Sequence, residues 1–509
     1  MNTLEEQIGQ MMIVGFDGLT APDYLLDWLR AGRAGGVILF QRNIESPEQV
    51  AALTASLHEA AKHPLMISID QEGGTVARLR GNFSESPGAL ALSSIREDRE
   101  EAAERVCGVL GAEMAALGIN WTYAPVVDLI YNADNPTVGT RSFGTSPGVV
   151  GRMGAAALRG FQNNGVAASA KHFPGLGDTA IDTHLDLPRL NTAPDHLLAV
   201  DLAPYRALIA DGLATVMTTH TIFTAIDAEH PATLSGAVIG QLLRGELGFD
   251  GVVTSDCMEM RAVGNHYGLQ EATIKAANAG VDMILYSHTA EQQSAAYDAL
   301  LDAARRGDVA ADTIADANRR IAALKARFPV GQINAEAVHT TAHHAIMEQA
   351  ARDAVIHVDG DGLPLDATRY VTLVEFAARA ESIAEEQADG SRLSHYLRGR
   401  LPELQAILLP PRPTPADVQA VRPVIDETSV LVFATRNAHM HPAQREAIAT
   451  LRAGVSNVIM LALRNPYDAA LGDGATVLCT CGDSIPSLQA GVAALMGDFA
   501  PSGVLPVEV

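Results

Sequence analysis

The sequence predicts an α/β protein in which a (β/α)8 TIM-like barrel is followed by a smaller α/β domain. Short apolar runs rich in Val and Ile alternate with longer Ala- and Leu-rich segments of helical period up to about residue 328. Polar residues close most of these runs or follow them directly. Beyond a helical stretch at 335–355 and a Gly/Asp-rich turn at 359–362, the same alternation restarts. These three observations define the two-domain prediction.

The first domain contains enough elements for a closed barrel. We expect its eight strands at 8–16, 36–40, 65–70, 119–127, 166–170, 214–219, 251–255 and 281–286. Helices are expected between them at 47–61, 100–117, 149–163, 197–211, 238–247 and 270–279. Several of these helices end at a glycine, which suits a left-handed C-cap. Eight such units are typical of a (β/α)8 barrel.

A doubly wound open sheet is the rival arrangement for the same alternation. The polar residues at the ends of six runs favour the barrel, because a barrel gathers all such ends at one mouth and an open sheet spreads them along an edge. These residues are Asp70, Asp128, Lys171, His220, Asp256 and Ser287.

The second domain is expected to be a three-layer sandwich of about five strands. Its strands are predicted at 370–376, 406–409, 430–434, 458–463 and 477–480, with helices at 415–427, 442–453 and 486–496. We therefore place the catalytic barrel at 1–334, a connecting helix and linker at 335–365, and the sandwich domain at 366–509.

Charge and composition limit the partners. The formal net charge of −24, from 36 basic and 60 acidic residues, argues against nucleic acid or an anionic membrane surface as a partner. The N-terminus has no basic segment followed by an apolar one, and no apolar run approaches the ~18 residues of a membrane helix. With four cysteines there is no disulfide framework. We expect a cytoplasmic protein with a small-molecule ligand.

Two places in the barrel region carry the residue types that acid–base and nucleophilic catalysis need. Asp182 and His184 stand one residue apart in a Gly-rich loop after the fifth run, so a carboxylate can orient an imidazole that donates and then accepts a proton. Asp256 closes the seventh run, where a carboxylate can attack an electrophilic carbon. Taken alone, Asp256 favours a helix N-cap or a loop aspartate over a nucleophile.

Four motifs in this order resemble those of the family 3 glycoside hydrolases, and specifically the bacterial β-N-acetylglucosaminidase branch. They are Ile69-Asp70-Gln71-Glu72-Gly73-Gly74 continuing to Val76-Ala77-Arg78-Leu79; Arg141-Ser142-Phe143-Gly144; Lys171-His172-Phe173-Pro174-Gly175 with Asp182-Thr183-His184; and Ser255-Asp256. The resemblance covers the whole barrel and extends less specifically to the second domain. One departure is Leu176, where many relatives carry His, which puts the substrate preference of this loop in question.

The resemblance implies roles for individual residues. Asp256 matches the nucleophile, His184 the general acid/base and Asp182 its dyad partner. Residues that match those holding the hydroxyls and acetamido group of the terminal sugar are Asp70, Arg78, Arg141, Lys171 and His172.

The activity implied is that of a retaining exo-β-N-acetylglucosaminidase acting on cell-wall (muropeptide) fragments or chitin oligosaccharides, with no cofactor and no metal. A phosphorylase of the same branch, using phosphate in place of water, is not separated from it by the sequence. Two other classes also stay open: a metal-dependent hydrolase with ligands among His172, Asp178, Asp182 and His184, and a non-catalytic sugar-binding protein. The oligomeric state is not indicated.

Overall fold

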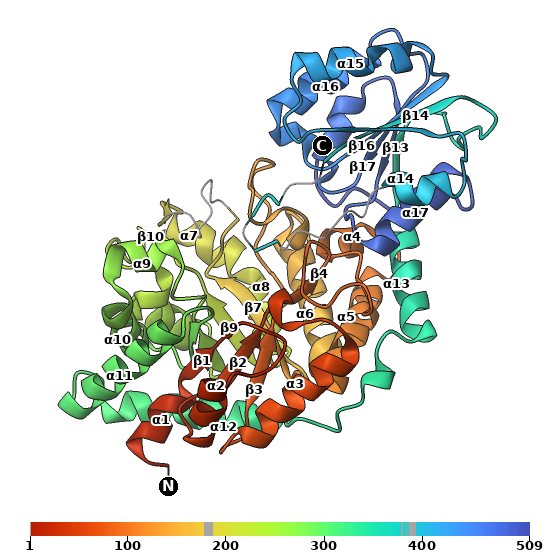
Figure 1. The fold of residues 1–509 in the computed structure, drawn as a ribbon. Helices are drawn as coiled ribbons and strands as arrows, with labels where there is room; N and C mark the ends of the chain where they lie inside the picture. Colours follow the sequence, from red (N-terminus) through yellow and green to blue (C-terminus); the bar gives the residue numbers. More distant parts are fainter. Residues whose placement is uncertain (1, 178–186, 378–379, 383, 386–392) are drawn as a thin grey trace.

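The computed structural model describes residues 2–177, 187–377, 380–382, 384–385 and 393–509 (Figure 1). Its first sheet is an eight-stranded parallel barrel in which the strands follow one another in chain order. The strands are β1 (Met12–Val14), β2 (Gly36–Leu39), β3 (Met66–Ile69), β6 (Trp121–Thr122), β7 (Ala167–Phe173), β9 (Thr215–Thr218), β11 (Val252–Thr254) and β12 (Ile284–Tyr286). A parallel bridge between Thr254 and Met283 joins the last two strands. The predicted barrel is confirmed.

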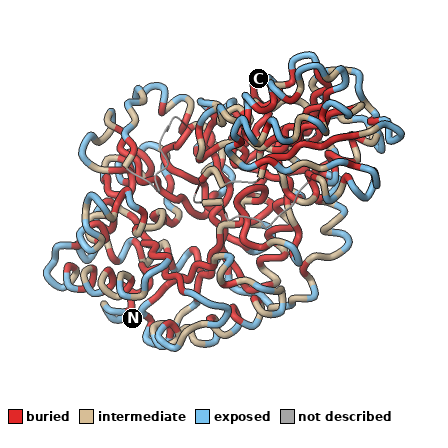
Figure 2. Tube along the Cα trace, turned by 45° about the horizontal axis from the view of Figure 1, so that its top comes forward, coloured by how far each residue is buried: buried red, intermediate tan, exposed pale blue. Residues whose placement is uncertain are grey.

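Helices cover the outside of this sheet, and the strands within it are buried while the outer helix faces are exposed (Figure 2). The covering elements are α2 (Asp23–Arg30), α3 (Pro47–Ala60), α5 (Arg99–Ala116), α6 (Pro147–Gln162), α8 (Ala203–Ala210), the π-helix η5 (Ala237–Glu246), α10 (Leu269–Ala279), α11 (Ala290–Arg306) and α12 (Ala311–Arg327).

The first predicted strand, 8–16, is wrong in its first part. Helix α1 (Leu4–Gln10) occupies that part, and β1 is limited to three residues. The helix begins with a capping box: Glu6 donates its backbone N–H to Thr3 Oγ1 at 3.2 Å, and Thr3 donates its backbone N–H to Glu6 Oε2 at 3.1 Å. This local pairing satisfies two of the N–H groups that a helix start leaves open, and it outweighs the strand-like apolar run.

Hydrogen-bonded side chains fill the barrel interior. Trp121 Nε1 donates to Ser169 Oγ at 2.8 Å and to Thr215 Oγ1 at 3.0 Å. Ser68 Oγ donates to the Tyr123 hydroxyl at 2.9 Å, and the Trp121 and Tyr123 rings meet edge to face. Because these buried polar groups are satisfied by one another, the interior is a packed core, and the residues at the strand ends are held at the mouth.

The second domain contains a six-stranded sheet in the order β13-β18-β17-β16-β14-β15. The strands are β13 (Ile356–Asp359), β14 (Val371–Phe376), β15 (Gln405–Leu409), β16 (Val430–Thr435), β17 (Val458–Ala462) and β18 (Thr476–Cys479). All neighbours are parallel except β13, which runs antiparallel to β18. The five expected strands are present, and the additional β13 falls in the range 335–365 that was expected to connect the domains.

Alternate residues of β16 face two different layers of helices. Leu431 and Phe433 belong to the core cluster that includes α15 (Pro415–Asp426) and α16 (Pro442–Arg452). Val432 and Ala434 belong to the cluster that includes α14 (Leu393–Arg398) and α17 (Ile485–Leu495). The predicted three-layer sandwich is therefore confirmed, with the helices on opposite sides of the sheet (Figure 1).

Helix α13 (Thr341–Asp353) leads from the barrel to this domain. At its end, the Ala354 carbonyl accepts a hydrogen bond at 2.9 Å from Ser94 Oγ of α4 (Ala89–Ser94). Within the described ranges, none of the helices has the length and apolar character required to cross a membrane.

Candidate active site

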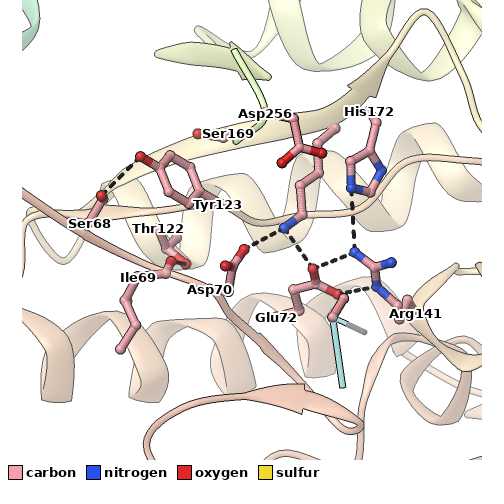
Figure 3. Close-up of polar contacts among 12 residues, drawn as sticks. Ser68, Ile69, Asp70, Glu72, Thr122, Tyr123, Arg141, Ser169, His172 and Asp256 are labelled. Carbon is pink, nitrogen blue, oxygen red and sulfur yellow. Dashed lines mark hydrogen bonds and ion pairs between the residues drawn. The ribbon is translucent and has the colours of Figure 1, made fainter. Parts of the chain in front are cut away.

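The polar residues predicted from the strand ends meet at the barrel mouth. Asp70 directly follows β3, and Lys171 and His172 lie in the last half of β7. Asp256 is the second residue after β11. Arg141 ends the short helix η2 (Gly139–Arg141) in the loop after β6. Figure 3 shows the side chains of Asp70, Arg141, His172 and Asp256 around one space.

Glu72 lies at the centre of this group. It belongs to β4 (Gln71–Gly73), and it accepts two hydrogen bonds from Arg141, from Nε and Nη2, both at 2.8 Å (Figure 3). Lys171 Nζ lies 2.7 Å from Oε1, the oxygen that also accepts from Arg141 Nη2. The side chains of Glu72, Arg141 and Lys171 are only 3–5% exposed. Burial alone would raise the pKa of Glu72, but the two cations outweigh it and lower the pKa to about 2.

Asp70 completes the network on the side of β3. Its Oδ1 accepts from Lys171 Nζ at 2.8 Å, and its Oδ2 lies 3.4 Å from Arg78 Nη2. Burial opposes ionisation of Asp70, but the charges of Lys171 and Arg78 hold its pKa well below the usual range. Burial likewise opposes the charge on Lys171, but Asp70 and Glu72 raise its pKa. Asp70, Glu72 and Lys171 are therefore all charged at neutral pH.

His172 is oriented by Asp128. The Asp128 carboxylate lies 2.7 Å from His172 Nδ1 and also accepts the backbone N–H groups of His172, at 3.2 Å, and Leu176, at 2.8 Å. Nδ1 therefore carries the proton, because a carboxylate can only accept there. The other ring nitrogen, Nε2, lies 3.5 Å from Arg141 Nη2.

These side chains line a cavity of about 370 Å³. In the described part of the chain four carboxylates line it: Asp70, Glu72, Asp256 and Glu259. Asp70 and Glu72 are paired with cations, and Glu259 accepts the backbone N–H groups of His288 at 2.7 Å and Thr289 at 2.9 Å.

Asp256 differs from these three carboxylates. Among the described residues its contact is the backbone N–H of Cys257, which donates to Oδ1 at 2.7 Å. Its second oxygen, Oδ2, has no partner in that part of the structure. The Cys257 carbonyl in turn accepts a hydrogen bond at 3.0 Å from Nε2 of His220, which is buried after β9.

The remaining predicted residues have different outcomes. Arg78, which follows β5 (Val76–Ala77), reaches the same cavity. Asp182 and His184 lie outside the described residues, as does Asp178 of the metal-site alternative. In the described ranges no group of three or more His, Cys, Asp or Glu side chains is arranged to hold a metal ion.

Sequence reasoning assigned no role to Glu72 or Asp128. Both had a signal: Glu72 lies inside the motif 69–74, and Asp128 follows the fourth apolar run. What the sequence does not show is their partners, which lie 69 and 44 residues away along the chain.

Comparisons with known proteins identify the family of this chain. The model of the glycosyl hydrolase family 3 N-terminal domain matches residues 3–324. Beta-hexosaminidase A of Pseudoalteromonas piscicida is 33% identical over 399 residues, which cover 72% of this chain and 67% of that protein. A beta-hexosaminidase of Alkalilimnicola ehrlichii is 39% identical over 279 residues, covering 54% of this chain and 79% of that protein.

This chain belongs to glycoside hydrolase family 3. The solved structure of a family 3 beta-N-acetylglucosaminidase from Paenibacillus sp. str. FPU-7 superposes over 100% of this chain and 99% of that chain, with a TM-score of 0.92 and 36% identity. The similarity therefore includes both domains. The protein is a glycoside hydrolase, and the recognition made from the four motifs is confirmed.

The central position of Glu72 in this family 3 enzyme can be tested with Glu72→Gln. The change keeps the shape of the side chain but leaves Arg141 and Lys171 buried without their shared anion. Breaking a buried ion pair costs about 3–5 kcal/mol of folding stability. A displacement of ~1 Å in the groups that position a substrate can lower the reaction rate about 10²-fold. We expect a loss of that order in kcat/KM and a lower melting temperature.

The matched control is Glu101→Gln, which removes an exposed carboxylate 3.7 Å from Arg105 and should change neither value measurably. Because folding lowers the pKa of Glu72 from 4.5 to about 2, its stabilisation is present above about pH 4.5 and is lost as the pH falls toward 2. The stability gap between wild type and Glu72→Gln should shrink over that range. The central role of Glu72 would be contradicted by an unchanged kcat/KM in Glu72→Gln together with a stability difference from wild type that stays the same over this pH range.

Proposed function

We propose that the protein is a retaining exo-β-N-acetylglucosaminidase. Support comes from the relatives, which are named beta-hexosaminidases, and from the family 3 structure named a beta-N-acetylglucosaminidase. The cavity volume is within the ~300–1,000 Å³ range of small-molecule pockets. We propose cell-wall fragments or chitin oligosaccharides with a terminal β-linked N-acetylglucosamine as the substrate class, and the cytoplasm as the location.

The observation that carries the mechanism is Asp256 Oδ2, which has no partner among the residues that the structure describes. A nucleophilic carboxylate needs an oxygen that no cation or N–H group already occupies. Oδ1 is oriented by the Cys257 N–H at 2.7 Å, which leaves Oδ2 to attack the anomeric carbon. The bond to the leaving oxygen breaks as the Asp256 ester forms, and water then releases the sugar with the anomeric configuration retained.

The paired residues are proposed to bind the sugar. Asp70 presents carboxylate oxygens to ring hydroxyls, and Lys171 and Arg141 present charged donors to hydroxyl or acetamido oxygens. Arg78 and His172 are the other two residues proposed to bind the sugar. Because the three cations are paired with the carboxylates of Asp70 and Glu72, most of their charge is balanced within the cavity while they donate hydrogen bonds to a neutral sugar.

Asp182 and His184, which lie outside the described residues, are proposed as the acid/base dyad. The imidazolium of His184 would protonate the leaving oxygen, and the neutral imidazole would then take a proton from the attacking water. Asp182 would stabilise the imidazolium.

The activity is tested by incubating the enzyme with 4-nitrophenyl N-acetyl-β-glucosaminide, with and without phosphate, and identifying the sugar product. We expect nitrophenol release that does not depend on phosphate, with free N-acetylglucosamine as the product. The matched glucoside is the control and should be a much poorer substrate. Dominant sugar-1-phosphate would identify a phosphorylase, and preference for the glucoside would remove the N-acetylglucosaminidase assignment.

The role of His184 is tested with His184→Ala and two leaving groups. Loss of the acid should greatly reduce cleavage of a natural disaccharide, whose alkoxide leaving group needs a proton, by about 10²–10⁴-fold. An aryl glycoside with an activated leaving group needs no proton in the first step, so formation of its glycosyl-enzyme should be far less affected. Measured burst rates that fall equally for both substrates would contradict the acid role.

A further inference from the structure

The carboxyl-terminal edge of the second sheet carries charged residues after three neighbouring parallel strands. Arg436 follows β16, Arg464 follows β17, and Asp483 follows β18 within four residues. In open α/β sheets this edge is where ligands bind. Here the charges bind one another: Asp483 Oδ2 accepts from Arg436 Nε at 3.0 Å and from Arg464 Nε at 2.9 Å.

The same arginine continues the network toward the barrel. Arg464 Nη1 donates to Glu385 Oε2 at 3.0 Å, and Glu385 lies in the connection that follows β14. The side chains of Arg464, Glu385 and Asp483 are 10–14% exposed. Burial opposes the negative charge of Asp483, but Arg464 and Arg436 lower its pKa. A mostly buried ion network of this kind holds its members in one geometry.

The residue before Glu385 reaches the candidate active site. The Ala384 carbonyl accepts a hydrogen bond from Arg78 Nη1 at 2.8 Å, and Ala384 lines the same cavity as Asp70 and Asp256. A local turn fixes this carbonyl, because the backbone N–H of Ala384 donates to Ser382 Oγ at 3.1 Å and that of Glu385 donates to the Ser382 carbonyl at 3.2 Å.

Close backbone approaches seat this edge of the second sheet against the barrel. A Cβ on Gly482, the neighbour of Asp483, would lie 2.2 Å from the Pro87 carbonyl oxygen. On the barrel side, a Cβ on Gly139 would lie 3.2 Å from Asn465 Nδ2, and Asn465 is the neighbour of Arg464. The residues next to Asp483 and Arg464 therefore contact barrel loops, and one of these loops carries Arg141.

Two distances show what this contact does for Arg78. The guanidinium lies 3.4 Å from Asp70 Oδ2, which is a long hydrogen bond, and 2.8 Å from the Ala384 carbonyl. The second-domain carbonyl is thus the closer of these two partners. Asp70 itself is held more tightly by Lys171, at 2.8 Å.

We propose that Glu385, Arg464 and Asp483 are positioning residues that act through Ala384 on Arg78, so that the second domain orients one sugar-binding side chain of the barrel. The inference rests on the proposed role of Arg78 in sugar binding. The role proposed for the second domain requires no contact between these three side chains and the substrate. The ion network fixes a turn, the turn fixes a carbonyl, and the carbonyl fixes the guanidinium of Arg78.

A double-mutant cycle tests this chain of contacts. Glu385→Gln, Arg78→Ala and the double variant are assayed for kcat and KM with the best substrate among a panel of aryl glycosides. We expect Glu385→Gln to lose about tenfold in kcat/KM, mainly through KM, and to cause little further loss once Arg78 is Ala. The control Asp498→Asn, which breaks the exposed Arg400–Asp498 pair of the same domain, should leave both constants unchanged.

The variant Glu385→Asp keeps the charge and shortens the side chain, and it serves if Glu385→Gln does not fold. It should show a smaller loss that also disappears in the Arg78→Ala background. The inference would be overturned if the loss in kcat/KM caused by a Glu385 substitution were as large in the Arg78→Ala background as in the wild type. An unchanged KM in both Glu385 variants would also overturn it. The proposed function fails separately, if the best aryl glycoside is not the N-acetylglucosaminide; an enzyme that cleaves none of the panel contradicts both.

Discussion

The ion network around Glu72 is the interaction on which the site depends. Its carboxylate binds Arg141 through two hydrogen bonds and Lys171 through a 2.7 Å contact, with all three side chains almost completely buried. Because these side chains are removed from water, burying any one of the charges by itself would cost a large desolvation free energy. The attraction within the group offsets that cost only while the geometry is kept. Since the three residues come from a hairpin, a loop and a barrel strand, their pairing fixes the relative positions of these segments.

This network also explains how similar carboxylates in one cavity can take different parts. Asp70 and Glu72 are held ionised and occupied by cations, so they can orient hydroxyl groups but are poorly placed to attack. Asp256 keeps one oxygen without a partner among the described residues and is fixed through its own loop by the Cys257 N–H. His220 holds the carbonyl of that loop residue, so the position of Asp256 derives from two barrel strands.

Periodicity and strand ends predicted much of this arrangement, because a barrel necessarily brings the ends of parallel strands together. Asp70, Lys171 and Asp256 were found in this way, whereas His172 was assigned through the resemblance to the family. Glu72 was missed as a site residue because its role comes from a partner 69 residues away. Two errors in the predicted strands have local causes. The capping box at Thr3 begins a helix where the apolar run predicted the start of the first strand. Strand β13 was not predicted because it is short and partly exposed and pairs antiparallel at the edge of its sheet, so its sequence resembles a linker.

The central claim is that Asp256 attacks a sugar held by the paired residues. It is tested most directly by treating the enzyme with 5-fluoro-N-acetylglucosaminyl fluoride, which slows release of the covalent intermediate, and locating the added mass by peptide mass spectrometry. The account predicts one sugar per chain, on the peptide and residue Asp256, and no label on the Asp256→Asn variant. A label on another carboxylate such as Glu259, or turnover with inversion of the anomeric configuration and no adduct, would contradict it.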